Sequence, residues 1–172
     1  NVTTEPANAA SKTIGLSGGT ISTTASDGTK YTLEIPEGAI AKPTRITMTP
    51  VRDIEGFPVL NAVAAGLQFT PSGLVFATPL TLTIESPVSP GTDEFPIAVN
   101  FEGDANAFTV GFAAVSAGKI VVPVQHFSGF GLDFGTEEDM SALLIALPLT
   151  PGAEICANEL LMAFYAAPDD GA

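Results

Sequence analysis

Short stretches in which apolar and polar residues alternate recur along most of the chain. The clearest is Leu80-Thr81-Leu82-Thr83-Ile84, and similar patterns occupy Tyr31–Ile35, Ile46–Thr49 and Ile120–Val124. A period of two places every second side chain on the same face of a strand. Each stretch therefore predicts a β-strand with one buried face.

Turn-forming residues separate these stretches at intervals of roughly ten residues, which is the spacing typical of a sandwich. Ser26-Asp27-Gly28-Thr29 predicts a tight hairpin, because Asp-Gly accepts the positive φ that such a turn requires. The pattern predicts a mainly β fold, an Ig-like antiparallel β-sandwich with a short helical C-terminal appendage. We expect residues 1–12 to be a flexible lead-in and residues 13–135 to form the sandwich.

The pattern changes at Thr136, which we predict to be a helix N-cap because three acidic residues follow it. Residues 136–172 are expected to be a helical apolar tail or the start of a truncated second module. An isolated tail would expose much apolar surface, so it should dock on the sandwich or on another subunit. The candidate interaction residues are Met140, Leu143, Leu144, Leu147, Ile155, Leu160, Leu161 and Phe164.

Charge narrows the range of partners. The 172 residues include 6 Lys plus Arg against 19 Asp plus Glu, giving a net charge of −13. Binding to nucleic acid or to an anionic membrane depends on Lys and Arg, so neither partner is expected. No apolar run reaches the roughly 18 residues of a transmembrane helix. The chain begins at Asn1 without a basic leader, which we interpret as a processed N-terminus. The acidic, Thr-rich and Lys-poor composition indicates an extracellular setting.

Few residues offer metal or redox chemistry. The single His and single Cys exclude the usual His/Cys zinc sites. Cys156 is expected to be a buried small apolar residue or, alternatively, half of an interchain disulfide. No cofactor is expected, although acidic loops are compatible with calcium. The calcium candidates are Asp53 with Glu55, Glu102 with Asp104, Asp93 with Glu94, and Glu137-Glu138-Asp139.

Several stretches together resemble the ZU-five domain, the sandwich of ankyrins, netrin receptors and zonula occludens proteins. They occur in the family's order over roughly Thr13 to Phe134. The sequence pattern is similar to that of the bacterial extracellular versions of the domain, which accompany surface and adhesive proteins. The matching stretches are Gly18-Gly19, Ile35–Ile40, Ile46–Val51, Phe69–Leu82 and His126–Gly131.

The resemblance also implies a candidate reaction. Some animal members of the family, like the nucleoporin autoproteolytic domain, cut themselves between Phe and Ser of a His-Phe-Ser sequence. Carried over, the Ser128 hydroxyl would attack the Phe127 carbonyl, with His126 as general base. The alternative is structural, with His126 packed at a turn, Phe127 in the core and Ser128 bonded to backbone.

The expected function follows from the resemblance, the acidic composition and the lack of a recognisable catalytic set. We expect a non-enzymatic structural or interaction module on a bacterial surface or in an extracellular assembly, with a protein partner or self-association. One alternative is a self-cleaving domain acting at Phe127–Ser128. Another is a sandwich that binds calcium or a glycan through its loops, although the absence of Trp counts against glycan stacking.

Overall fold

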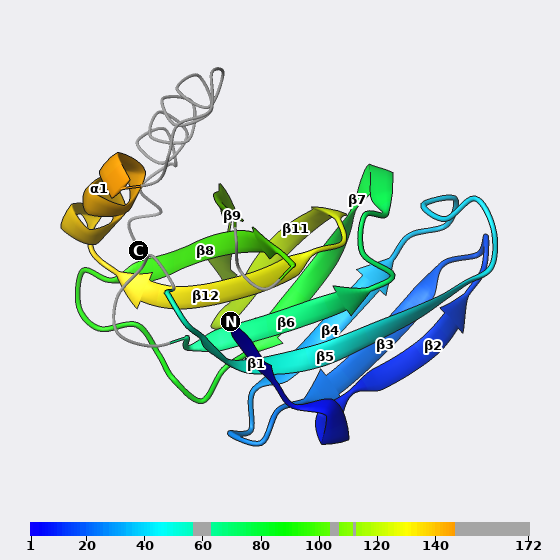
Figure 1. Cartoon of the computed structure of the whole chain (residues 1–172), viewed down its shortest axis with the longest axis horizontal. Helices are drawn as coiled ribbons and strands as arrows, with labels where there is room; N and C mark the ends of the chain where they lie inside the picture. Colours follow the sequence, from blue (N-terminus) through cyan, green and yellow to red (C-terminus); the bar gives the residue numbers. More distant parts are fainter. Residues whose placement is uncertain (57–62, 104–106, 112, 147–172) are drawn as a thin grey trace.

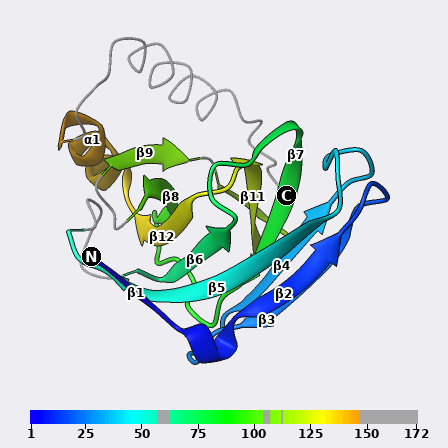
Figure 2. The same cartoon turned by 45° about the vertical axis from the view of Figure 1, so that its right-hand side comes forward.

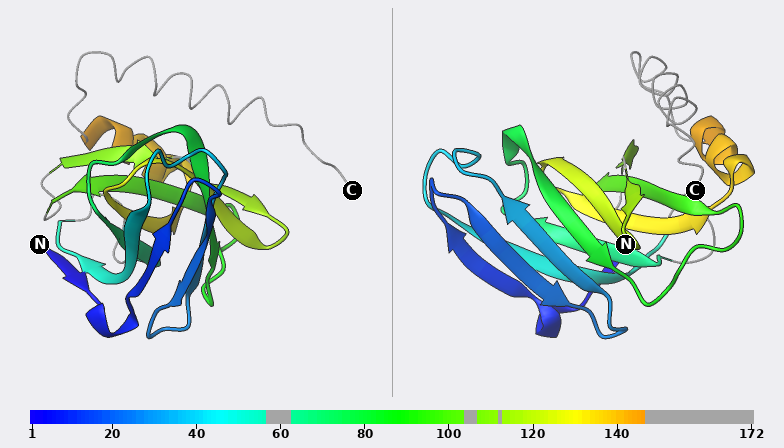
Figure 3. Two further views of the ribbon diagram at one scale, coloured as in Figure 1. Left: turned by 90° about the vertical axis from the view of Figure 1, so that its right-hand side faces the viewer. Right: turned by 180° about the vertical axis from the view of Figure 1, so that it is seen from behind.

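The computed structural model describes residues 1–56, 63–103, 107–111 and 113–146. Within these residues the chain forms two antiparallel sheets packed as a sandwich, followed by one short helix (Figure 1). The predicted fold class is confirmed. Seen from behind, the smaller sheet lies in front of the larger one (Figure 3, right).

Two sheets of unequal size make up the described part of the sandwich. The larger has the order β1-β5-β6-β12-β8-β9, with β2 also paired to β5, and the smaller has the order β10-β11-β7-β4-β3. The larger sheet contains β1 (Val2–Thr4), β2 (Ala10–Ile14), β5 (Thr44–Ile54), β6 (Ala65–Thr70), β8 (Phe95–Glu102), β9 (Ala107–Gly111) and β12 (Gly129–Gly135). The smaller contains β3 (Gly19–Thr24), β4 (Lys30–Ile35), β7 (Val75–Glu85), β10 (Ala114–Ser116) and β11 (Lys119–His126).

The N-terminal residues differ from the expected flexible lead-in. β1 and β2 both pair with β5, and the 3-10 helix η1 (Pro6–Asn8) lies between them. β2 exposes Ser11, Lys12 and Thr13 and buries Ile14 alone. An edge strand held by backbone hydrogen bonds needs no alternation of apolar residues. The polar composition of residues 1–12 therefore led to the wrong prediction of a flexible segment. Figure 2 shows β2 beside β3 of the smaller sheet, where Lys12 Nζ donates to the Thr20 carbonyl at 3.0 Å.

The strand that contains the predicted stretch Ile46–Thr49 runs on through Pro50. β5 continues to Ile54 because Pro50 lies where the pairing on its outer side passes from β2 to β1. There the Pro50 carbonyl accepts a hydrogen bond from the Glu5 N–H at 2.8 Å. The missing N–H of proline is tolerated at such an interrupted edge.

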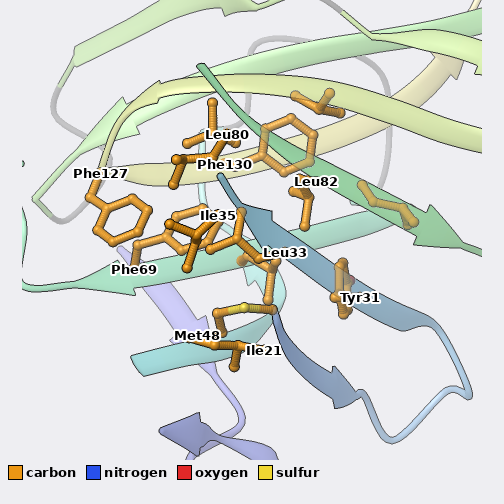
Figure 4. Packing of buried hydrophobic residues seen from close by; sticks show 14 of the residues in the cluster. Ile21, Tyr31, Leu33, Ile35, Met48, Phe69, Leu80, Leu82, Phe127 and Phe130 are labelled. Carbon is orange, nitrogen blue, oxygen red and sulfur yellow. The ribbon is translucent and has the colours of Figure 1, made fainter. Parts of the chain in front are cut away.

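The main core fills the space between the sheets (Figure 4). The alternating strands supply it as predicted, since Leu80, Leu82 and Ile84 of β7 are fully buried. Tyr31 is also buried, and its hydroxyl accepts a hydrogen bond from the Gly66 N–H at 2.9 Å. Burial raises the pKa of this hydroxyl, so Tyr31 is neutral throughout the physiological range.

A second cluster lies on the outer face of the larger sheet. A side chain at Gly129 would overlap the ring of Phe101 on the neighbouring strand β8. Phe101 is 1% exposed and packs with Val51 and Ile54. Gly129 therefore leaves room for an aromatic ring against the sheet, which explains a glycine at the start of β12.

Helix α1 (Glu137–Ala146) covers another part of that face. The buried Leu143 packs with Ile97 and Val99 of β8, and Met140 lies against the same cluster. The predicted N-cap is confirmed, because the Thr136 hydroxyl oxygen accepts a hydrogen bond from the Asp139 N–H at 3.4 Å. In return, the N–H and the hydroxyl of Thr136 both donate to Asp139 Oδ2, at 2.9 and 2.7 Å. These bonds from Thr136 hold the pKa of Asp139 below its usual value.

Candidate functional site

The stretch His126-Phe127-Ser128 joins the two sheets at one end of the sandwich. His126 ends β11 of the smaller sheet and Gly129 begins β12 of the larger one. Only Phe127 and Ser128 lie between the strands, so the chain changes sheets within two residues. We call this stretch, residues 126–128, the corner.

Aromatic packing fixes the middle of the corner. Phe127 is 1% exposed, and its ring stacks on Phe69 with centroids 4.8 Å apart and planes 6° from parallel. The ring of Phe76 meets it edge-on, also at 4.8 Å. Figure 4 shows Phe127 beside Phe69 at the margin of the core. Such pairs add to the free energy of burial, so Phe127 is held in one position.

Three backbone hydrogen bonds also hold the corner. The Phe127 N–H donates to the Leu74 carbonyl, and the Gly73 N–H donates to the Phe127 carbonyl, both at 2.8 Å. The Ser128 carbonyl accepts a bond from the Phe69 N–H at 3.2 Å. One bond thus holds the carbonyl of the Phe127–Ser128 peptide group, and the other two hold the peptide groups before and after it, with all three partners in β6 or in the segment that connects β6 to β7.

The polar side chains of the corner contact each other. Ser128 Oγ lies 3.2 Å from His126 Nε2 and also 3.2 Å from the Gly129 carbonyl. A hydroxyl has one proton, so the two contacts correspond to two states. With the proton of His126 on Nε2, Ser128 donates to Gly129. With it on Nδ1, Ser128 donates to Nε2, and the imidazole is then placed to act as a base.

Two hollows flank these side chains. One, of about 490 Å³, is lined by His126, Ser128, Gly73 and Glu102. The other, of about 220 Å³, is lined by His126, Ser128 and Asn100. His126 and Ser128 are both half-buried. The corner therefore combines a buried ring with a hydroxyl and an imidazole that small molecules such as water can reach.

The acidic calcium candidates are not brought together. Asp53 and Glu55 lie at the end of β5, Glu102 lies at the end of β8, and all three are exposed. Asp104 is outside the described residues. Glu94 instead accepts a bond from the Gly91 N–H at 2.7 Å. Among the residues described, no group of three or more His, Cys, Asp or Glu side chains is arranged to hold a metal ion.

The candidate interaction residues fall into two groups. Met140 and Leu143 pack on the chain's own larger sheet. The side chain of Leu144 lies outside the described part, as do Leu147, Ile155, Cys156, Leu160, Leu161 and Phe164.

Sequence reasoning did not identify the partners of the corner. The backbones of Gly73 and Leu74 form hydrogen bonds with the backbone of Phe127, and Asn100 lines the smaller hollow. The Thr-Pro-Ser-Gly turn before Leu74 is a visible signal in the sequence. Its proximity to the corner follows only from the pairing of β7 with β11, which places Val75 opposite His126.

Comparison with known proteins adds no family assignment: no family model matches the chain, and no curated protein matches it. The resemblance to the ZU-five domain stays a prediction. In the described ranges, no helix has the length and apolar character needed to cross a membrane.

Proposed function

We propose that the chain is a non-enzymatic structural and interaction module of a secreted or surface-exposed bacterial protein or extracellular assembly. The observation that supports this is the docking of α1. Leu143 is 2% exposed against Ile97 and Val99, and α1 follows directly from the central strand β12. The apolar tail after Ala146 therefore continues from a fixed base on the sandwich, and it docks there or on a neighbouring subunit.

Removing the tail while keeping α1 tests this function. We compare the full chain, the chain ending at Ala146, and a full-length variant with Leu160, Leu161 and Phe164 replaced by Ser. Light scattering reports the mass in solution, and calorimetry reports the melting temperature. If the tail docks on a second subunit, the measured mass corresponds to more subunits for the parent than for either variant. If it docks on its own sandwich, the parent has the higher melting temperature. The same number of subunits and equal melting temperatures in all three would overturn the proposal.

A second candidate function is self-cleavage at Phe127–Ser128, which the 3.2 Å contact between Ser128 Oγ and His126 Nε2 favours. Oγ forms a bond to the Phe127 carbonyl carbon while its proton passes to His126. The carbon–nitrogen bond then breaks, and His126 returns the proton to the Ser128 nitrogen. Water hydrolyses the resulting ester, giving the Phe127 carboxyl group and the Ser128 hydroxyl.

Intact mass under denaturing conditions tests this candidate. The parent chain is compared with Ser128→Ala, which lacks the nucleophile, and with His126→Gln, which keeps a polar side chain but no base. Self-cleavage gives two fragments that meet at Phe127–Ser128 and together weigh one water more than the chain. A single mass of 17.5 kDa for the parent after long incubation would exclude self-cleavage, and the corner would then have a packing role alone.

A further inference from the structure

We propose that the backbone N–H of Gly73 is the oxyanion donor of the corner, so that the Thr70–Gly73 turn is a working part of the cleavage site. The inference rests on self-cleavage, the second function proposed above. In that reaction negative charge develops on the carbonyl oxygen of Phe127 when Ser128 Oγ attacks. Gly73 N already lies 2.8 Å from that oxygen. The donor is therefore already in contact with the atom on which the charge develops.

The donor is held in place before any reaction occurs. Gly73 and the next residue, Leu74, bind the carbonyl and the N–H of Phe127, each at 2.8 Å, so two bonds fix the turn against one residue. The bond from the Phe69 N–H, in the adjoining strand β6, to the Ser128 carbonyl holds the peptide group that follows the scissile one. A donor that needs no reorientation stabilises developing charge more than a mobile one does.

The identity of residue 73 fits this placement. Its φ is +79°, a left-handed conformation that glycine adopts without penalty. Gly73 also lines the larger hollow together with His126 and Ser128. The donor, the base and the nucleophile therefore border one space from which water can reach the ester.

The decisive test removes the N–H and leaves every side chain unchanged. Assembling the chain from peptide fragments allows glycolate to replace Gly73, which changes the amide N–H into an ester oxygen. Gly38 provides a matched control: its φ is also +79°, and its N–H donates to the Leu16 carbonyl, again at 2.8 Å. Each replacement thus deletes one backbone hydrogen bond of equal length at a glycine of equal conformation.

We expect the Gly73 ester to slow the appearance of the two fragments by roughly 10²–10³-fold, the usual effect of losing one oxyanion donor. The Gly38 ester should cleave at nearly the parent rate, and both should have similar melting temperatures. If the two esters cleave equally fast, Gly73 is not the donor although self-cleavage stands. If the parent chain stays intact, self-cleavage fails and this inference fails with it.

A second pair of variants is used if the Gly73 ester does not fold. Gly73→Ala and Gly38→Ala place the same strain on the backbone, and neither new Cβ would meet an atom within 4 Å. Relief of that strain at residue 73 moves the N–H away from the Phe127 carbonyl. We expect cleavage to slow several-fold more for Gly73→Ala than for Gly38→Ala, and equal rates would overturn the proposal.

Discussion

The two ends of the sandwich connect the sheets by different means. At the corner the chain itself passes between the sheets, and the buried Phe127 ring packs against Phe69 and Phe76. At the other end Glu5, beside the edge of the larger sheet, accepts bonds from Ser26 in a turn of the smaller sheet. Asn8 also donates to Glu5, at 2.8 Å. We call Glu5, Asn8 and Ser26 the latch.

The difference separates a connection made by burial from one made by charge. Removing an aromatic ring from a packed site forfeits both transfer free energy and contacts. The latch lies near the surface, where water competes for each hydrogen bond, so it contributes less. It does respond to pH: the bonds from Ser26, foremost that of its hydroxyl, lower the pKa of the Glu5 carboxyl. The corner thus contributes more to stability, and the contribution of the latch changes with pH.

The largest loss of stability is expected from Phe127→Ala. The change empties the space between Phe69 and Phe76 and should cost about 3–5 kcal/mol of unfolding free energy. Urea denaturation measures it. Val75→Ala is the control, since Val75 lies opposite His126 but is 79% exposed, and it should change stability by less than about 0.5 kcal/mol. Similar effects of the two substitutions would contradict the tight packing of the corner.

A smaller loss of stability is expected from Gly129→Ala. Gly129 follows the corner directly, and its new side chain would point to the outer face of the larger sheet. The new Cβ would overlap the Phe101 ring, and overpacking of this kind costs about 1–3 kcal/mol. Gly15→Ala is the matched control because its Cβ would meet nothing within 4 Å. Thermal melts of both variants give the comparison. A Gly129→Ala chain as stable as the control would show that Phe101 moves aside freely.

The smallest effect, and the only one that depends on pH, is expected from Glu5→Gln. The pKa of Glu5 is lowered from 4.5 in the folded chain, so its ionised form adds stability above that pH. The variant should be less stable than the parent at neutral pH. This difference should shrink as pH falls below 4.5 and through the lower folded pKa, because the parent then also carries an uncharged group. Glu37→Gln in an exposed turn controls for the change in net charge.

Unfolding curves at several pH values measure the latch effect. A difference between parent and Glu5→Gln that stays constant from neutral to acid pH would show that the Glu5 charge does not hold the latch.

Local patterns in the sequence were sufficient to predict the strands that face the core and the residue that caps the helix. Leu80, Leu82 and Ile84 alternate because one face of β7 is buried, and the Thr136 side chain caps α1 by accepting a bond from the Asp139 N–H. The edge strands β1 and β2 gave no such signal, since backbone pairing with β5 holds them.

The candidate site divides in the same way. His126 and Ser128 are neighbours in sequence, so a strand end was enough to place them together. The donor at Gly73 belongs to a distant turn, and only the pairing of β7 with β11 brings it to Phe127. Long-range pairing of this kind has no local signature. The proposed tail interactions involve mostly residues outside those described.

The position of β12 has a consequence for how the chain folds. It is the last strand in sequence among those described, yet it lies inside the larger sheet between β6 and β8. During synthesis the earlier strands emerge first, and β6 and β8 have unpaired edges until residues 129–135 leave the ribosome. Such late, long-range insertion makes folding slow and exposes strand edges to other chains. Nascent chains halted before β12 should therefore be the species most prone to aggregate.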